Sequence, residues 1–518
     1  ISNLDIDNGR IMIFENKQLT LDEWNNGVLA IDKSVNKNII INKSDSYDAN
    51  KLYWIQKGSA LEGIYTDPDT NQSYGFNKFG GKSSLNKTGS ILAIPVFPNS
   101  MIYIYQAIGL TFNTSGFNII FEYKIPTQNE WNEGTANYFD FSKLIILDKS
   151  GTYNSTKYFW VQIGKWVYSS KHKDTHLYGH IYLSETGKTV LIPLSTAKNS
   201  NKNYGSSRGL VRVYDYKIPS QTEWNNGIDD VSYTNETYFS DSDNNEISIV
   251  GKSGAYDSNS TKHYWVQRGN NLWGDKDSSH YGAFATLAKD GNTIAIAPRY
   301  FSTDTDTLTD PGLVRMFSFN ESNKIWESKG NDFIGINNEK VTFEVSYGSY
   351  GRPVIQLSYD GNIIAISSGY GSTSKFYVGK WNGTNWSFNS LSPPYSKYSK
   401  WKYYMAAGGI SMNLNGNQII AGSPYWNSPY VRSMNSYSYD SRGCITIYDI
   451  ASQEIPTITY ENTDIGISYS PNKINTVSIH PIIDKIPTSF SISEPLSSGL
   501  SFNTLTGVIE GIPTQYQE

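Results

Sequence analysis

The amino-acid sequence predicts an all-β protein whose main part is a β-propeller of five to seven blades, with five blades best counted. A turn between two apolar runs recurs five times, and each copy is followed by two further strand patterns. Aromatic residues make up 14 % of the chain and glycine occurs 43 times, a composition typical of strands and tight turns. Repeated small sheets cannot bury both faces alone, so we expect neighbouring copies to stack as blades.

The first element of each repeat is a predicted β-hairpin. Its turn ends in a glycine after Asp, Asn or Thr, which supplies a positive-φ position, and β-branched residues then predict a strand buried on both faces. The five copies are SSLNKTGSILAIPV from Ser83, IYLSETGKTVLIPL from Ile181, ATLAKDGNTIAIAP from Ala285, IQLSYDGNIIAISS from Ile355 and SMNLNGNQIIAGSP from Ser411.

Two further strands complete each predicted blade. The third strand nearly alternates, as in LVRVYDY from Leu210, and the fourth carries tryptophan, as in YWVQRG around Trp265. A similar third strand, GRIMIF, begins at Gly9, ahead of the first hairpin. We therefore expect the N-terminal segment to complete the last blade and close the ring, which removes an exposed sheet edge.

An insertion separates the third strand from the fourth in the first three repeats. Its copies are DEWNNG from Asp22, FEYKIPTQNEWNEG from Phe121 and VYDYKIPSQTEWNNG from Val213. We interpret each insertion as an extra hairpin that projects from its blade, and helices are not expected. The propeller with these hairpin insertions is predicted to span residues 1–452.

Charge and hydropathy exclude two classes of partner. The net charge of -5 arises from 43 basic and 48 acidic residues without long runs of either sign, so no nucleic acid is expected to bind. No stretch approaches the roughly twenty apolar residues of a membrane helix, so no membrane insertion is expected.

The repeats resemble the FG-GAP repeat, the blade unit of integrin-α-like propellers. The resemblance rests on an aromatic–glycine pair before the hairpins, at Phe79-Gly80, Tyr178-Gly179, Tyr281-Gly282 and Tyr350-Gly351, and covers roughly residues 9–450. In that family a DxDxDG turn within the hairpin holds calcium. Here the same turns contain ETG, KDG, YDG or LNG, so the resemblance does not extend to that calcium position.

The C-terminal segment, residues 453–518, resembles the immunoglobulin-like domains that occur in strings on cell-surface proteins. The resemblance rests on GLSFNTLTGVIEGIPT from Gly499, in which glycines separate short strands. In that family a final strand follows the last motif, and here this strand is expected to be missing. The open edge of the sandwich is therefore a predicted site of self-assembly by strand addition.

Acidic pairs after the tryptophan strands are candidate calcium ligands, because carboxylates two residues apart suit Ca²⁺. They are Asp67, Asp69, Asp275 and Asp277. The alternative is that they are solvated turn residues. No cofactor is predicted with certainty, and calcium is the candidate.

Aromatic residues on both sides of the fifth hairpin are the candidate ligand-binding site, because such rings stack on sugars and anchor protein interfaces. They are Tyr395, Tyr398, Trp401, Tyr403, Tyr404, Trp426 and Tyr430. The alternative is that they only cover the long loops of the last blades.

Sequons of the N-x-S/T type are candidate glycosylation sites if the chain passes through a eukaryotic secretory route. They occur at Asn42, Asn71, Asn86, Asn154, Asn235, Asn259, Asn320 and Asn382.

The leading functional hypothesis is an extracellular adhesion or recognition module of a cell or virion surface, which binds a glycan or a surface protein through propeller loops. We find no G-x-S-x-G nucleophile elbow, no Cys/His pair with suitable surroundings and no glycine-rich phosphate loop before a helix, so no catalytic residue is assigned and an enzyme is not expected. Two alternatives remain open. One is a structural subunit of a surface layer, fibre, filament or virion, and the other is a polysaccharide hydrolase or lyase.

Overall fold

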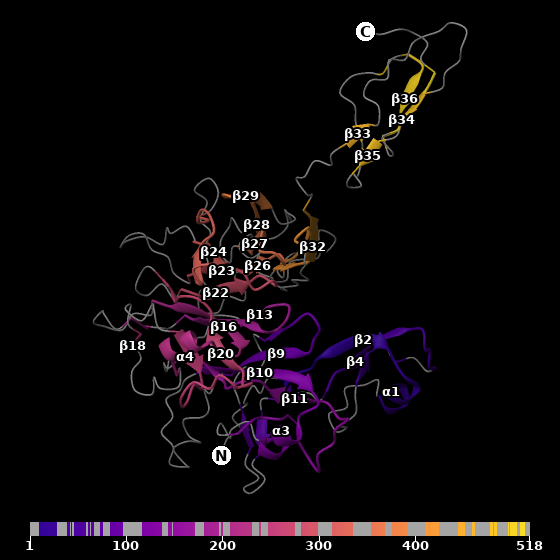
Figure 1. Ribbon diagram of the computed structural model, residues 1–518. Helices are drawn as coiled ribbons and strands as arrows, with labels where there is room; N and C mark the ends of the chain where they lie inside the picture. Colours follow the sequence, from indigo (N-terminus) through magenta and orange to yellow (C-terminus); the bar gives the residue numbers. More distant parts are fainter. Residues whose placement is uncertain are drawn as a thin grey trace, which may run out of the picture. The chain divides into compact units, whose positions relative to one another are not determined.

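The computed structural model shows an all-β chain that divides into two compact units, Ile1–Asp449 and Ile450–Glu518 (Figure 1). The structure describes residues 10–27, 39–41, 43, 46–58, 61–62, 64–66, 73–75, 83–96, 116–136, 143–147, 149–170, 181–195, 198–199, 208–229, 238–239, 247–274, 281–298, 313–334, 354–367, 376–391, 410–413, 415–423, 444–450, 458–460, 477–479, 481–483, 496, 498–504 and 508–512.

The five predicted hairpins each form the inner half of an antiparallel sheet, which confirms the propeller. We number these sheets 1 to 5 in chain order. Sheet 1 contains β8 (Ser84–Leu85), β9 (Ile91–Val96), β10 (Gly116–Lys124), β11 (Phe159–Gln162) and β12 (Val167–Ser170). Sheet 2 contains β13 (Tyr182–Leu183), β14 (Thr189–Leu194), β16 (Leu210–Lys217), β20 (Tyr264–Gln267), β19 (Ile247–Val250), β17 (Gly227–Ile228) and β21 (Leu272–Trp273).

The next three sheets are simpler. Sheet 3 contains β22 (Phe284–Leu287), β23 (Thr293–Ala297), β24 (Arg315–Asn320) and β25 (Ile325–Ser328). Sheet 4 contains β26 (Ile355–Leu357), β27 (Ile363–Ser367), β28 (Phe376–Trp381) and β29 (Trp386–Leu391). Sheet 5 contains β30 (Ile410–Met412), β31 (Gln418–Ser423) and β32 (Cys444–Asp449). Three short strand pairs complete the unit. β1 (Arg10–Ile11) pairs with β5 (Leu61–Glu62), and β6 (Ile64–Thr66) pairs with β7 (Ser73–Gly75). β15 (Lys198–Asn199) pairs with β18 (Tyr238–Phe239).

The hairpin turns of successive sheets contact one another through backbone hydrogen bonds. The backbone amide of Lys87 donates to the backbone carbonyl oxygen of Glu185 at 3.2 Å. The backbone amide of Glu185 in turn donates to the carbonyl oxygen of Lys289 at 2.6 Å. The Asp290 amide continues the series to the Tyr359 oxygen at 3.0 Å. The innermost strands of sheets 1 to 4 therefore follow one another around one region, as the blades of a propeller do.

The N-terminal segment differs from the expected strand exchange. Its strands β2 (Phe14–Gln18), β4 (Leu52–Gln56) and β3 (Ile40–Ile41) pair with one another in what we call the N-terminal sheet. No ladder among the described residues joins this sheet to sheet 5. Ile13, which precedes β2, instead packs in one core cluster with Phe121 and Trp160 of sheet 1. The N-terminal segment therefore lies before sheet 1 as a partial sheet of its own.

The insertions begin with short helices rather than with the expected hairpins. The helices are α1 (Leu21–Asn26), α3 (Gln128–Glu133) and α4 (Gln221–Asn226). Each has a capping box, in which a Thr or Ser side chain accepts from the backbone of a Glu three residues on and that Glu accepts in return. The apolar strand after each helix does pair with the tryptophan strand, as Ile249 does with Val266.

The buried tryptophan of each helix explains why so short a helix is stable. Trp24, Trp131 and Trp224 are all buried. A lysine further along the chain lies over each ring and donates to the carbonyl oxygen of the glycine at the helix end, as Lys43 does to Gly27 at 2.7 Å. The cation satisfies a carbonyl that the helix leaves without a partner.

The C-terminal unit contains two small antiparallel sheets. One pairs β33 (Ile458–Tyr460) with β35 (Pro481–Ile483), and the other orders β34 (Val477–Ile479), β37 (Ile509–Gly511) and β36 (Leu500–Phe502). A β-sandwich is built from two sheets, so these two sheets of short strands agree with the expected fold.

Candidate functional site

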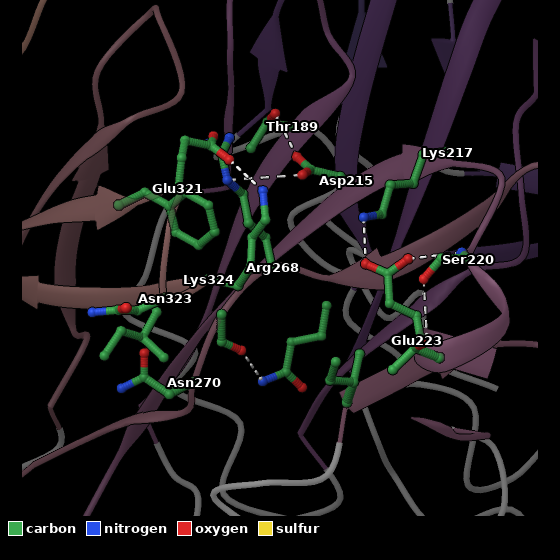
Figure 2. A pocket seen from close by; sticks show the side chains of 16 residues that line it. Thr189, Asp215, Lys217, Ser220, Glu223, Arg268, Asn270, Glu321, Asn323 and Lys324 are labelled. Carbon is green, nitrogen blue, oxygen red and sulfur yellow. Dashed lines mark hydrogen bonds and ion pairs between the residues drawn. The ribbon is translucent and has the colours of Figure 1, made fainter. Parts of the chain in front are cut away.

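A cavity of about 710 Å³ lies between the outer parts of sheets 2 and 3. Strand ends β16, β20 and β24 line it together with helix α4 (Figure 2). Its wall combines the charged side chains Asp215, Glu223, Arg268 and Glu321 with apolar side chains such as Ile325. A hollow of this size can hold a small ligand, and its polar groups would fix the orientation of that ligand.

Arg268 is the central residue of this cavity. Its Nη2 donates to Asn292 Oδ1 at 2.7 Å and to Glu321 Oε1 at 3.0 Å, and its Nη1 donates to the Gly291 oxygen at 3.2 Å. The guanidinium carbon lies 4.1 Å from the centroid of the Phe319 ring. Arg268 therefore joins the tryptophan strand of sheet 2 to the hairpin turn and third strand of sheet 3.

Helix α4 presents a second charged group to the cavity, as Figure 2 shows. Glu223 accepts from Lys217 Nζ at 2.5 Å and from the Ser220 amide at 2.8 Å. Burial raises the pKa of Glu223, but the bonds from Lys217 and Ser220 more than offset it and hold the pKa below 4.5. The bond from Lys324 likewise lowers the pKa of Glu321.

Both lowered pKa values bear on the charge of the cavity. A general acid at neutral pH needs a raised pKa, and the carboxyl groups of Glu223 and Glu321 are instead held ionised. The side chains of Asn270, Asn323 and Thr222 add polar atoms to the lining. These groups offer hydrogen-bond donors and acceptors to a polar ligand.

The hairpin turns of sheets 3 and 4, where the FG-GAP resemblance would place calcium, each accept hydrogen bonds from a protein cation. Lys329 Nζ donates to the Gly361 oxygen at 2.8 Å and to Asn362 Oδ1 at 2.9 Å. Arg268 makes the equivalent bonds to Gly291 and Asn292. Because side-chain cations use these oxygens, the two turns do not fit a calcium ion.

The predicted ligand-binding and calcium residues lie outside the described residues. This applies to Tyr395, Tyr398, Trp401, Tyr403, Tyr404, Trp426 and Tyr430 and to Asp67, Asp69, Asp275 and Asp277. Among the described residues, no group of three or more His, Cys, Asp or Glu is placed to hold a metal ion. No described helix has the length and apolar character needed to cross a bilayer.

The sequons fall into three groups. Asn42, Asn71 and Asn235 lie outside the described residues, whereas Asn154, Asn259 and Asn382 are exposed and Asn320 is half-buried. Asn86 is buried, and its Oδ1 accepts from the amides of Ser90 and Ile91 at 2.9 Å each. Glycan attachment at Asn86 would require the first hairpin turn to open.

The structure does locate the ends of the two aromatic-rich segments. Segment 392–409 ends at β30, and segment 424–443 connects β31 to β32. Ile410 pairs with Ala421, and Ser423 pairs with Cys444. Ile410, Ser423 and Cys444 therefore lie at one end of sheet 5, opposite its hairpin turn, whereas segment 392–409 begins after Leu391 of sheet 4.

Sequence reasoning missed the cations that join the sheets. The signal was present, because the residue before the glycine in WIQKG, WVQRG and WESKG is basic in three of the tryptophan strands. Its partners lie in the next sheet, which the sequence alone does not place.

Comparisons with known proteins identify no family. No family model and no curated protein matches the chain. Among solved structures, TolB from Acinetobacter baumannii is 12 % identical with a TM-score of 0.28, and the match covers 76 % of this chain and 57 % of TolB. The β-propeller domain of Cps50 (Swd1) from Myceliophteria thermophila is 8 % identical with a TM-score of 0.26, over 75 % of this chain and 90 % of that domain.

A third similar structure is a prolyl oligopeptidase. Prolyl oligopeptidase B from Galerina marginata is 9 % identical with a TM-score of 0.29, over 83 % of this chain and 53 % of that enzyme. The chain thus spans just over half the length of TolB and of this oligopeptidase. The class of protein that its own sheets define is an all-β protein with a five-blade propeller.

Proposed function

We propose that this chain is a surface-exposed recognition module of the extracellular space, a cell or a virion, and that it binds a glycan or a surface protein without transforming it. The binding surface is formed by segments 392–409 and 424–443, and the FG-GAP-like propeller and the immunoglobulin-like unit act as its scaffold. Calcium at Asp67, Asp69, Asp275 and Asp277 remains part of this proposal.

The pairing at one end of sheet 5 is the observation that carries the proposal. Because Ile410 pairs with Ala421 and Ser423 pairs with Cys444, segment 392–409 ends, and segment 424–443 begins and ends, at the same end of sheet 5. A strand scaffold that brings two loops to one end is the usual foundation of a binding face. The segments contain the seven candidate aromatic residues, whose rings suit sugars and protein interfaces.

The experiment is a glycan array with the full chain, in the presence and absence of Ca²⁺. We expect binding to selected glycans that falls at least about tenfold in the variants Trp401→Ala, Tyr403→Ala and Trp426→Ala. The matched control is Tyr158→Ala, because Tyr158 is 52 % exposed on sheet 1 and lies before the start of β11. Equal binding by all variants, or loss in the control alone, would exclude the proposed surface.

A second assay separates a glycan ligand from a protein ligand. Labelled chain is added to cells treated with glycosidases or with protease, and the bound label is measured. Loss after glycosidase treatment indicates a glycan, and loss only after protease treatment indicates a protein. Release of reducing ends from a polysaccharide during incubation would contradict the proposal and favour an enzyme.

A further inference from the structure

Sheets 1 to 4 meet through one repeated contact, in which a tryptophan packs with an aliphatic pair of the sheet before it. The two members of each pair lie directly opposite each other on adjacent strands. Trp265 shares a core cluster with Ala93 and Ile120, Trp326 with Leu191 and Val213, and Trp386 with Ala295 and Met316. We call the tryptophan side of a sheet its backward face and the aliphatic-pair side its forward face.

The backward face of the N-terminal sheet is exposed at its described residues. Trp54 is 46 % exposed, although Trp160 and Trp265 at the same position of sheets 1 and 2 are 2 % and 0 % exposed. Ile41, which pairs with Trp54, is 40 % exposed. Its counterparts Leu147 and Val250 are buried in the cores of sheets 1 and 2.

The forward face of sheet 5 is also exposed. Its aliphatic pair is Ile420 and Ile447, which lie opposite each other and are 44 % and 63 % exposed. The corresponding pair on sheet 4, Ala365 and Val378, is 1 % and 6 % exposed. The first and last sheets of the series therefore each expose one half of the contact that joins sheets 1 to 4.

We propose that these two faces bind each other between copies of this chain, with sheet 5 of one copy packed on the N-terminal sheet of the next. At the three interfaces among sheets 1 to 4 a tryptophan packs with an aliphatic pair, and Trp54 and the Ile420–Ile447 pair reproduce these two halves. Both faces are exposed in the same chain, so both are available to a second copy. Contiguous exposed apolar side chains of this kind mark an interaction surface.

The contact is heterologous, since two different faces meet. Such a contact leaves one free face of each kind on every dimer, so it builds chains or closed rings of subunits. It uses no residue of segments 392–409 or 424–443. Loss of ligand binding and loss of assembly are therefore separate outcomes.

Sedimentation velocity of the full chain with complementary variants tests the proposal. Wild-type chain is expected to form oligomers that grow with concentration, and Trp54→Glu or Ile447→Glu should weaken association at least about tenfold. A mixture of the two variants keeps one intact face of each kind, so it should form heterodimers and nothing larger. The control Ile218→Glu, at a residue 45 % exposed just after β16 of sheet 2, should assemble like wild type.

Cross-linking distinguishes assembly from closure within one chain. In a Cys444→Ser background, Leu52→Cys marks the backward face of the N-terminal sheet and Gln418→Cys marks the forward face of sheet 5. Chains that carry one cysteine each are mixed and treated with a short bis-maleimide, and a mixed dimer is expected. A double-cysteine chain that links only to itself, or wild-type chain that stays monomeric at every concentration, would overturn the proposal.

Discussion

The indole Nε1 of Trp265 donates to the backbone oxygen of Ile163 at 3.1 Å, and this bond ties sheet 2 to sheet 1. The same bond recurs from Trp326 to the Arg268 oxygen at 2.8 Å and from Trp386 to the Lys329 oxygen at 2.7 Å. A fourth tryptophan, Trp160, occupies the same position, but its buried Nε1 has no hydrogen-bond partner within the described residues. A comparison of Trp265 with Trp160 therefore measures how much this hydrogen bond contributes to stability.

The first prediction compares Trp265→Phe with Trp160→Phe. Both changes remove the same ring atoms from a buried site, but only Trp265→Phe leaves a buried carbonyl without its donor. We expect it to lower the free energy of unfolding by about 1–2 kcal/mol more than Trp160→Phe does. Urea denaturation followed by fluorescence measures both, and equal losses would show that the indole bond adds nothing.

The second prediction concerns the cation that binds the hairpin turn of sheet 4. Lys329→Met keeps most of the side-chain volume but removes the donor to the Gly361 oxygen and to Asn362 Oδ1. We expect a loss of about 1–3 kcal/mol, because a buried carbonyl is left unpaired. Lys324→Met is the control, since its exposed pair with Glu321 should contribute less than about 1 kcal/mol. A neutral Lys329→Met variant would contradict this assignment.

The third prediction concerns Gly361 in the same turn. Its φ is +64°, and a Cβ there would lie 2.2 Å from the Cβ of Thr293 on sheet 3. Gly383 also has a positive φ, +99°, but a Cβ there would meet nothing within 4 Å. We expect Gly383→Ala to lower the free energy of unfolding by about 1–2 kcal/mol through backbone strain. Gly361→Ala should lower it clearly more, because sheets 3 and 4 must also separate to make room for the new methyl group. Thermal unfolding of the two variants decides this, and a smaller effect at Gly361 would be inconsistent with the close packing of the turns.

The fourth prediction concerns acid stability. Burial raises the pKa of Glu130, but the bonds from Lys124 and Thr127 outweigh it and lower the pKa below 4.5. A lowered carboxyl pKa adds stability above the unfolded value, and this stability is lost as the pH falls through the folded value. We therefore expect the wild type to lose more melting temperature than Glu130→Gln between pH 7 and pH 3. Glu133→Gln, at an exposed residue of the same helix, should follow the wild type.

The sequence predicted the sheets because their information is local. In the segment from Ile355 to Ser367, an Asp-Gly turn and a run of β-branched residues specify a hairpin without any reference to the rest of the chain. The helices were missed although their signal was also local, because Thr127 and Glu130 have capping-box spacing. The short EWN segment offered too few residues to show a helical period.

Local patterns thus determined the strands, the turns and the five-fold repeat. Tertiary structure alone decided which charges meet, since Arg268 and Glu321 are 53 residues apart. It also decided which tryptophans are covered, because Trp54 and Trp265 lie in nearly the same local sequence and differ only in whether another sheet packs on them. Whether a side chain is buried depends on which other sheet packs on its face, and the sequence of one strand does not specify that sheet.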